Sequence, residues 1–312
     1  MTNPRILFMG TPAFALPALR LLHGQRYPIA GVVTQPDRPK GRGLKEIASP
    51  VKILAQEFGL NVYQPEKVKD PSFMELLQQL HPDMITVAAF GQILPKSVIE
   101  YPRLGCLNIH PSLLPRYRGA APINWQIING EKKTGVTIML MDEGMDSGDI
   151  LLQEESQLDC EENFGELHDR LAKLGAALLI QTIDQVISGT ASRQKQETSG
   201  VTFAPRLTRE TGKILWTSNA SDIVNLIRGL SPLPAAYTFM DGLPLKIFSA
   251  VARHENVQQP PGTICAIEAD SLSVATADGY VIVKDVQLAG KKRMPIADFL
   301  RGYHLKIGNS LS

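Results

Sequence analysis

Residues 105–149 read GCLNIHPSLLPRYRGAAPINWQIINGEKKTGVTIMLMDEGMDSGD and combine a polar strand end with an acidic turn. Apolar residues alternate with Asn108 and His110, so both polar side chains should project from the same face of a strand. Proline follows His110 directly, which disfavours helix and predicts that the strand ends there. A second strand, predicted over 136–141, leads into the turn that carries Asp146.

An amide, an imidazole and a carboxylate in one place suit acyl transfer without a covalent enzyme intermediate. We predict that Asn108 donates a hydrogen bond to an oxyanion, that His110 carries a proton or a positive charge, and that Asp146 holds the imidazole in one tautomer. The alternative is that an Asn and a His at a strand end are only satisfied loop-entry residues. A calcium loop fits less well, because the acidic positions lack the alternating ligand spacing of an EF-hand.

Strands and helices alternate through the first half of the chain, which predicts an α/β fold with a Rossmann-like, mostly parallel sheet. Ligands of such sheets gather beyond the carboxyl ends of the strands, where Asn108 and His110 are expected. The first turn, which begins at Gly10, lacks the later glycines of GxGxxG, so no dinucleotide site is expected. The predicted strands are 5–10, 29–34, 61–63 and 84–89, and the predicted helices are 12–22, 51–58 and 72–80.

The second half is predicted to be a smaller, β-rich domain. A long helix over 163–187 closes a first domain at 1–189, a polar segment without periodicity forms a linker at 190–208, and the second domain spans 209–312. Asp-Gly pairs at 241 and 278 are hairpin signals. Closely spaced short strands suggest a small OB-like β-barrel. After a helix at 220–229, the strands are predicted at 236–240, 245–251, 262–267, 272–277 and 280–288.

The composition, 44% hydrophobic and 20% charged residues, is that of an ordinary globular protein. We expect no stretch apolar and long enough to cross a bilayer, no signal peptide, no membrane partner and a cytoplasmic location. The three cysteines form no CxxC pair, which agrees with a reducing compartment. Cys106 is predicted to be buried strand filler that alternates away from the polar face rather than a nucleophile.

Positive charge gathers at two places, although the net charge is only +1. Residues 190–312 carry 14 Lys and Arg against 10 Asp and Glu, which favours contact with a polyanion. Around residue 40, basic side chains stand among prolines and glycines and leave no apolar face to bury, which predicts a mobile basic loop. That loop is either a solvated surface segment or one that closes over a phosphate-bearing substrate.

The motifs NIHPSLLPRYRGAAP and MDEGMDSGD resemble the signature of the folate-dependent formyltransferases, and the whole chain resembles the members that act on methionyl-tRNA. The resemblance implies transfer of a formyl group from 10-formyltetrahydrofolate to the amine of initiator methionyl-tRNA, with no metal. It places Asn108, His110 and Asp146 on the catalytic triad. The residues implied to bind folate are Ser112, Leu113, Leu114, Pro115, Phe90, Gly91, Leu140 and Asp142. Ser147 stands where relatives commonly have Thr.

The basic loop resembles the inserted loop by which these members hold the acceptor end of the tRNA. The residues of this loop predicted to contact tRNA are Arg38, Lys40, Arg42 and Lys45. Lys291, Lys292 and Arg293 cluster after the last predicted strand, where they form either a solvated charge run or a second tRNA contact. Three alternatives remain open: a sister enzyme acting on glycinamide ribonucleotide or a sugar amine, a hydrolase of 10-formyltetrahydrofolate, and a tRNA-binding module without catalysis. A monomer is expected.

Overall fold

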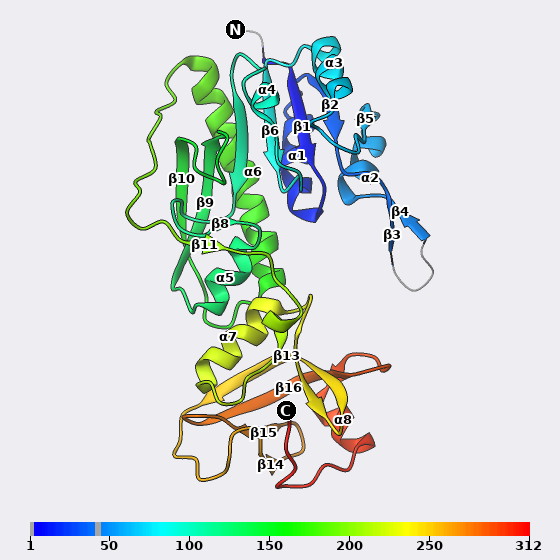
Figure 1. Ribbon diagram of the computed structural model, residues 1–312, viewed down its shortest axis with the longest axis vertical. Helices are drawn as coiled ribbons and strands as arrows, with labels where there is room; N and C mark the ends of the chain where they lie inside the picture. Colours follow the sequence, from blue (N-terminus) through cyan, green and yellow to red (C-terminus); the bar gives the residue numbers. More distant parts are fainter. Residues whose placement is uncertain (1–2, 41–44) are drawn as a thin grey trace. The chain divides into compact units, whose positions relative to one another are not determined.

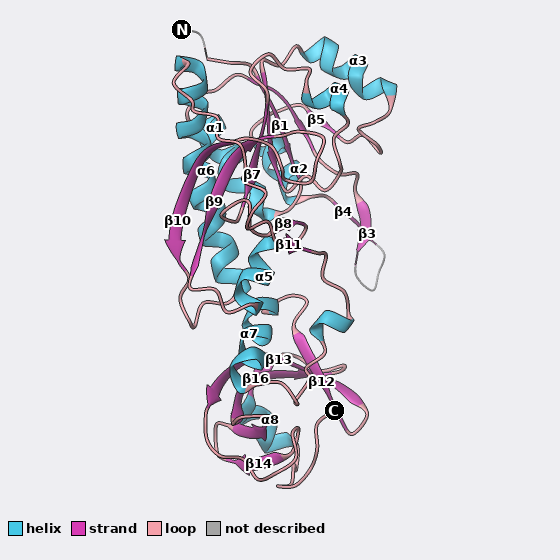
Figure 2. Cartoon of the chain, turned by 60° about the vertical axis from the view of Figure 1, so that its left-hand side comes forward, coloured by secondary structure: helices cyan, strands magenta, loops and turns pink. Residues whose placement is uncertain are grey.

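The computed structural model describes residues 3–40 and 45–312, and its contacts divide the chain into two compact units (Figure 1, Figure 2). The first unit comprises the residues up to 119, 134–157 and 168–203. The second comprises 120–133, 158–167 and 204–312. Each unit is therefore assembled from three separate stretches of sequence.

A seven-stranded sheet with the order β10-β9-β7-β6-β1-β2-β5 forms the centre of the first unit. Its strands are β1 (Ile6–Gly10), β2 (Ile29–Val33), β5 (Val62–Tyr63), β6 (Met84–Ala88), β7 (Cys106–His110), β9 (Lys133–Leu140) and β10 (Ile150–Gln157). The strands from β5 to β7 pair in parallel, and β9 pairs antiparallel with β7. The predicted mostly parallel sheet is confirmed, and the strand order reverses at β1, where such folds open a crevice at the carboxyl ends.

The helices of the first unit begin where the sequence places helix-starting residues. They are α1 (Leu16–Gly24), α2 (Pro50–Glu57), α3 (Pro71–Leu80), α4 (Lys96–Ile99) and α6 (Phe164–Ser188), with a 3-10 turn at Ala13–Ala15. Both α2 and α3 have proline in the first turn, where its missing N–H costs nothing. The Ser49 hydroxyl caps α2 by accepting from the Lys52 amide at 3.0 Å.

The longest helix, α6, packs directly on the sheet (Figure 1). A Cβ added at Gly175 would lie 2.6 Å from Ile109 and 3.2 Å from Val136, so glycine permits this close approach to β7 and β9. Among the helices in the described part of the chain, α6 alone is long and apolar enough to cross a membrane by composition. The helix is not a continuous apolar stretch, because Lys173 and Asp184 interrupt its apolar residues. Half of the apolar window is buried inside the protein, as in the core helix of a globular unit.

Two short pairings were not predicted from the sequence. The arms of the basic loop, β3 (Arg38–Lys40) and β4 (Lys45–Ile47), form an antiparallel hairpin. It projects beyond the end of β2 in Figure 1, so residues 38–40 and 45–47 form paired strands where a loop was predicted. Backbone pairing of the arms needs no apolar face, which is why the composition gave no sign of it. The strands β8 (Arg118–Gly119) and β11 (Phe203–Ala204) also pair.

The second unit is an antiparallel sheet covered by helices. Its elements are α5 (Pro122–Ile128), a 3-10 turn at Glu210–Gly212, α7 (Ala220–Leu230), β12 (Ala236–Met240), β13 (Leu243–Arg253), β14 (Ile264–Ile267), β15 (Leu272–Ala275), β16 (Tyr280–Leu288), β17 (Met294–Pro295) and α8 (Ile296–Gly302). The strand order is β12-β13-β16-β15-β14, and β17 pairs with β16. Both predicted Asp-Gly hairpins are present. Asp241 and Gly242 have φ of +50° and +76°, as a two-residue hairpin turn of the I′ type requires. Closure of this sheet into an OB-like barrel stays a prediction.

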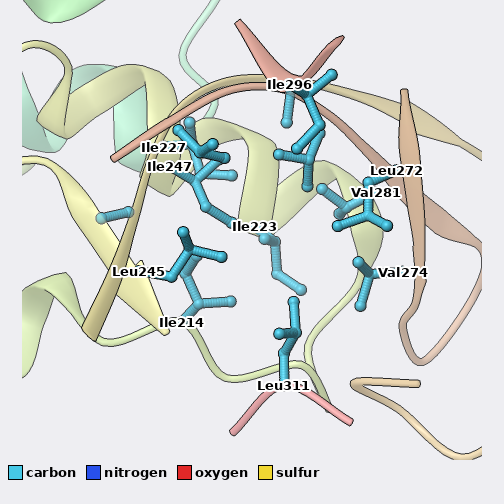
Figure 3. Packing of buried hydrophobic residues seen from close by; sticks show 14 of the residues in the cluster. Ile214, Ile223, Ile227, Leu245, Ile247, Leu272, Val274, Val281, Ile296 and Leu311 are labelled. Carbon is cyan, nitrogen blue, oxygen red and sulfur yellow. The ribbon is translucent and has the colours of Figure 1, made fainter. Parts of the chain in front are cut away.

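The core of the second unit lies between α7 and the sheet. Ile223 and Ile227 of α7 are buried and belong to the same cluster as Leu245 and Ile247 of β13 (Figure 3). Residues four apart on a helix lie on one face, and residues two apart on a strand lie on one face. Ile223 and Ile227 therefore point to the same side of α7, and Leu245 and Ile247 to the same side of β13.

Candidate active site

The polar residues of the first motif lie on a central strand of the first unit. Asn108 is in register with Val87 of β6 and Met139 of β9, and His110 is in register with Thr137 of β9. Neighbours on both sides occupy the hydrogen-bonding groups of β7, so the strand is held rigidly. It ends at His110, as predicted.

The imidazole of His110 is held from two sides and is only 4% exposed. Its Nε2 lies 3.0 Å from the carbonyl oxygen of Tyr117. A carbonyl can only accept, so Nε2 carries a hydrogen and donates it. Nδ1 lies 3.6 Å from Oδ2 of Asp146, beyond direct hydrogen-bond range but close enough for ion pairing once protonated. Nδ1 is therefore the nitrogen that can gain or lose a proton, and it faces a carboxylate.

The carboxylate of Asp146 is oriented by the backbone opposite it. Its Oδ2 accepts a hydrogen bond of 2.8 Å from the Gly119 amide. Both Asp146 and Tyr117 have left-handed backbone, with φ of +50° and +61°. Non-glycine residues hold such conformations where the surrounding structure over-determines them, and they cluster at functional sites.

The side chain of Asn108 is half-buried and makes no hydrogen bond to any residue that the structure describes. It projects from the same strand face as His110, so its amide is free to donate to a bound oxygen atom. Cys106 shares that face too, which corrects the prediction that it alternates away. Complete burial raises the pKa of the Cys106 thiol, and its Sγ lies 3.5 Å from Sδ of Met141. Cys106 therefore stays a protonated thiol in the core, as expected of strand filler.

The loop after His110 is fixed by a buried hydroxyl. Thr137 Oγ1 donates to the carbonyl of Ser112 at 2.6 Å and accepts from the Leu114 amide at 3.2 Å. Ser112 is fully buried, and its own hydroxyl donates to the Arg116 carbonyl at 2.7 Å. Leu114 is also buried, whereas Leu113 and Pro115 are half-buried. Of the predicted folate residues in this loop, only the latter two have much side-chain surface to offer.

Two cavities of ligand size flank β9 and β10 in the first unit. One of about 400 Å³ is lined by Leu140 and Asp142, together with Cys106 and Met141. Another of about 390 Å³ is lined by Leu114, Pro115, Gln153 and Gln196, among others. The carboxylate of Asp142 accepts from the Ser147 hydroxyl at 2.8 Å.

Phe90 and Gly91, the two other residues predicted to bind folate, line neither of these cavities. The Phe90 carbonyl accepts from the hydroxyl of Thr11 at 2.9 Å and from the amide of Gln35 at 3.3 Å. The structure thus brings His110 and Asp146 together, while Leu140 and Asp142 line one of these cavities and Leu114 and Pro115 line the other.

The formyl transferase family model matches residues 5–183, and the model for the formyl transferase C-terminal domain matches residues 206–304. The chain belongs to the formyl transferase family. It is 55% identical over 311 residues to the methionyl-tRNA formyltransferase of Syntrophus aciditrophicus, with 100% of both chains covered. It is 47% identical to that of Citrifermentans bemidjiense, covering 100% of this chain and 97% of the relative.

Solved structures share the fold of this formyl transferase at much lower identity. HypX from Aquifex aeolicus in complex with tetrahydrofolic acid superposes with a TM-score of 0.67 at 17% identity, covering 96% of this chain and 47% of HypX. The N-formyltransferase from Helicobacter canadensis in complex with folinic acid has a TM-score of 0.66 at 18% identity, covering 94% and 100%.

The basic residues predicted to contact tRNA differ in whether other side chains of the formyl transferase already bind them. Arg38 is exposed, as are Lys291 and Lys292. Arg293 instead binds Asp285 at 2.8 Å, and its guanidinium lies 4.4 Å from the centre of the Phe248 ring. Arg42 lies outside the described residues, and so do the side chains of Lys40 and Lys45.

The sequence analysis missed two backbone groups of the site, the carbonyl of Tyr117 and the amide of Gly119. Backbone groups leave no residue-type signal. The glycine at 119, with its φ of +121°, was the one available hint that the chain turns back toward the acidic loop here.

Proposed function

We propose that this formyl transferase moves the formyl group of 10-formyltetrahydrofolate to the α-amine of initiator methionyl-tRNA in the cytoplasm. The observation that carries the proposal is 55% identity to a methionyl-tRNA formyltransferase across the entire chain, the C-terminal domain included. Identity confined to the first domain would have left a sister formyltransferase equally plausible.

In this proposal, Asn108, His110 and Asp146 serve the transfer directly. The amine adds to the formyl carbon, a C–N bond forms, and the carbonyl oxygen becomes negatively charged. The uncommitted amide of Asn108 donates to that oxygen, a contact of a kind worth about 100- to 1,000-fold in rate. The bond to N10 of the folate then breaks, and a proton passes from the amine to N10.

The proton path in this proposal runs through Nδ1 of the His110 imidazole, the nitrogen that does not bind the Tyr117 carbonyl. A free α-amine has a pKa of about 7.7 to 8.0 and esterification lowers it, so neutral amine is present near pH 7 without a strong base. Because Nε2 donates to Tyr117, Nδ1 is the position at which His110 accepts or carries charge. Asp146 presents its Oδ2 to that nitrogen at 3.6 Å.

We propose the cavity of about 400 Å³ beside Leu140 and Asp142 for the flat pteridine ring, because apolar side chains such as Met141 and charged side chains such as Asp142 both line it. The proposal keeps the turn at Phe90 and Gly91 and the loop of residues 112–115 as further folate contacts. We assign no metal to the reaction.

For tRNA, the proposal assigns the backbone contacts to the β3–β4 hairpin and to the exposed lysines after β16. The residues assigned to the first contact are those predicted from the sequence of the basic loop, Arg38, Lys40, Arg42 and Lys45. Lys291 and Lys292 carry the second contact, whereas Arg293 contributes less because Asp285 holds its guanidinium. In this scheme, 1–189 perform the chemistry, 209–312 bind tRNA, and the enzyme acts as a monomer.

The decisive experiment offers 10-formyltetrahydrofolate together with methionyl-tRNA, glycinamide ribonucleotide or water alone, and follows tetrahydrofolate release. The proposal expects turnover with methionyl-tRNA and N-formylmethionyl-tRNA as product. Faster release with glycinamide ribonucleotide or with water would assign the chain to a sister enzyme or a hydrolase. Tight tRNA binding without any release would reduce it to a binding module.

A further inference from the structure

We infer that Gln196 and Thr202, which lie outside both motifs, are positioning residues that hold the two groups flanking the His110 imidazole. The inference rests on the proposed function, since it assigns these residues to the same reaction. Both belong to the polar segment that the sequence analysis treats as a linker. In the structure, residues 190–203 are part of the first unit.

Every hydrogen-bonding group of the Gln196 side chain is used. Its Nε2 donates to the carbonyls of Asp146 and Gly148, both at 2.8 Å. Its Oε1 accepts from Nη2 and Nε of Arg118, at 2.6 Å and 3.0 Å. A side-chain amide with two donors and one oxygen has no further capacity for strong bonds. Gln196 therefore links the acidic turn, residues 142–149, to Arg118.

The contacts of Gln196 close a ring that contains the catalytic carboxylate. Gln196 binds the backbone of Asp146 on one side and the side chain of Arg118 on the other. Arg118 is bonded covalently to Gly119, and the Gly119 amide donates to Oδ2 of Asp146. Both the backbone and the carboxylate of Asp146 are thereby fixed relative to the same short strand.

The acidic turn depends on these hydrogen bonds for its conformation. Asp146 adopts left-handed backbone, and the preceding Met145 is 62% exposed, so little packing holds the turn from that side. A shift of about 1 Å at a catalytic group can cost about 100-fold in rate.

Thr202 acts on the opposite side of the imidazole. Its Oγ1 accepts from the Tyr117 amide at 2.8 Å, and its carbonyl accepts from the Arg118 amide at 2.9 Å. Tyr117 in turn presents its carbonyl to Nε2 of His110. The segment from Gln196 to Thr202 therefore supports the Nδ1 side through Asp146 and the Nε2 side through Tyr117.

The first test replaces Gln196 by methionine, which keeps the length of the side chain and removes its polar atoms. Gln194→Met is the matched control, because Gln194 is exposed in the same segment and bridges to Ile150 through backbone atoms only. We expect kcat for formyl transfer to fall about 30- to 100-fold in Gln196→Met, with KM for both substrates within about twofold. Gln194→Met should match the wild type.

The second test distinguishes positioning from a general structural role. In an Asp146→Asn background, Gln196→Met should lower kcat by less than about threefold, because the group it positions is already impaired. Equal losses in both backgrounds would overturn the inference, and so would a normal kcat in Gln196→Met.

Thr202 is tested by an exchange of its hydroxyl. Thr202→Val removes the acceptor for the Tyr117 amide at constant shape, and kcat should fall about tenfold, whereas Thr202→Ser should restore it. Failure of Thr202→Ser to restore kcat would overturn this half of the inference. If the wild-type enzyme shows no formyl transfer, the proposed function itself fails, an outcome separate from any of these results.

Discussion

Nδ1 of His110 faces Oδ2 of Asp146 across 3.6 Å, while Nε2 of the same ring donates to the Tyr117 carbonyl. The ring can therefore neither flip nor exchange tautomers without losing a buried hydrogen bond. Its orientation is set before any substrate arrives, which is the condition for electrostatic catalysis by a preorganised site.

Asp146→Asn should lower kcat about 100- to 1,000-fold while KM for 10-formyltetrahydrofolate changes less than about twofold, because the carboxylate acts on developing charge. Steady-state kinetics of formyl transfer to methionyl-tRNA measures both constants. Asp169→Asn is the control, since Asp169 pairs with His168 at 2.9 Å elsewhere on the first unit. Near-normal turnover of Asp146→Asn would show that the assigned roles are wrong.

Asn108→Ala should reduce kcat by about 100-fold or more, since it removes the amide we assign to the oxyanion. The fold should survive, because the Asn108 side chain has no hydrogen-bond partner within the described chain. Circular dichroism and a urea titration check stability beside the kinetics. A loss of stability that matches the loss of activity would count against a catalytic role.

Gly148→Ala should destabilise the protein by about 2 kcal/mol or more. A Cβ at this position would lie 1.8 Å from the carbonyl oxygen of Leu140, so the acidic turn would have to move. Gly24→Ala is the matched control, because a Cβ there meets nothing within 4 Å at the end of α1. The urea midpoint should fall for the first variant and stay or rise slightly for the second.

Stability at alkaline pH should depend on Tyr27. Burial, together with the hydrogen bond of 2.8 Å to Asp184, raises the pKa of Tyr27 from 10.0 to about 12. Because the pKa of Tyr27 is higher in the folded state, the neutral phenol stabilises the folded protein fully below pH 10.0. This stabilisation is lost as the pH rises toward about 12. Urea midpoints at pH 8, 10 and 11.5 should therefore fall more steeply for the wild type than for Tyr27→Phe. Parallel curves would contradict the prediction.

Replacing Lys291 and Lys292 together by alanine should raise KM for methionyl-tRNA severalfold and leave kcat unchanged, since we assign both to phosphate contacts. The slope of log affinity against log salt should become shallower by about 1 to 2. Arg293→Ala should act differently. One oxygen of Asp285 is already buried and has no hydrogen-bond partner among the described residues, so this variant should lose stability first. Identical salt slopes for the wild type and the double variant would remove the lysines from the interface.

Most of the fold could be predicted because hydrophobic periodicity and turn residues agree along the chain. The strand at 280–288 and the helix at 220–230 illustrate this, since β16 and α7 match their predictions almost residue for residue. What escaped prediction was pairing that depends on distant partners. The residues of β10 do not alternate between buried and exposed. The strand lies at the edge of the sheet, its first two residues are buried, and most of the others are exposed.

Only those parts of the site that side chains contribute could be predicted from the sequence. Asn108, His110 and Asp146 could be found because amide, imidazole and carboxylate are rare together in a motif. The groups that orient them are backbone atoms of Tyr117 and Gly119 and a glutamine from a polar segment. The structure is needed to find these groups, because every residue has a backbone carbonyl and the sequence does not show which one faces the site.

The interleaving of the two units has a practical consequence for anyone who wishes to study the second unit in isolation. Helix α5 belongs to the second unit, where Asn124 donates to the Gly229 carbonyl at 2.7 Å and Ile128 fills the space that a side chain at 229 would need. A truncated gene that starts after the long helix would omit α5 and leave that surface of α7 bare. Excision at the apparent junction would yield an incomplete fragment, so graft or fusion experiments must carry residues 120–133 along.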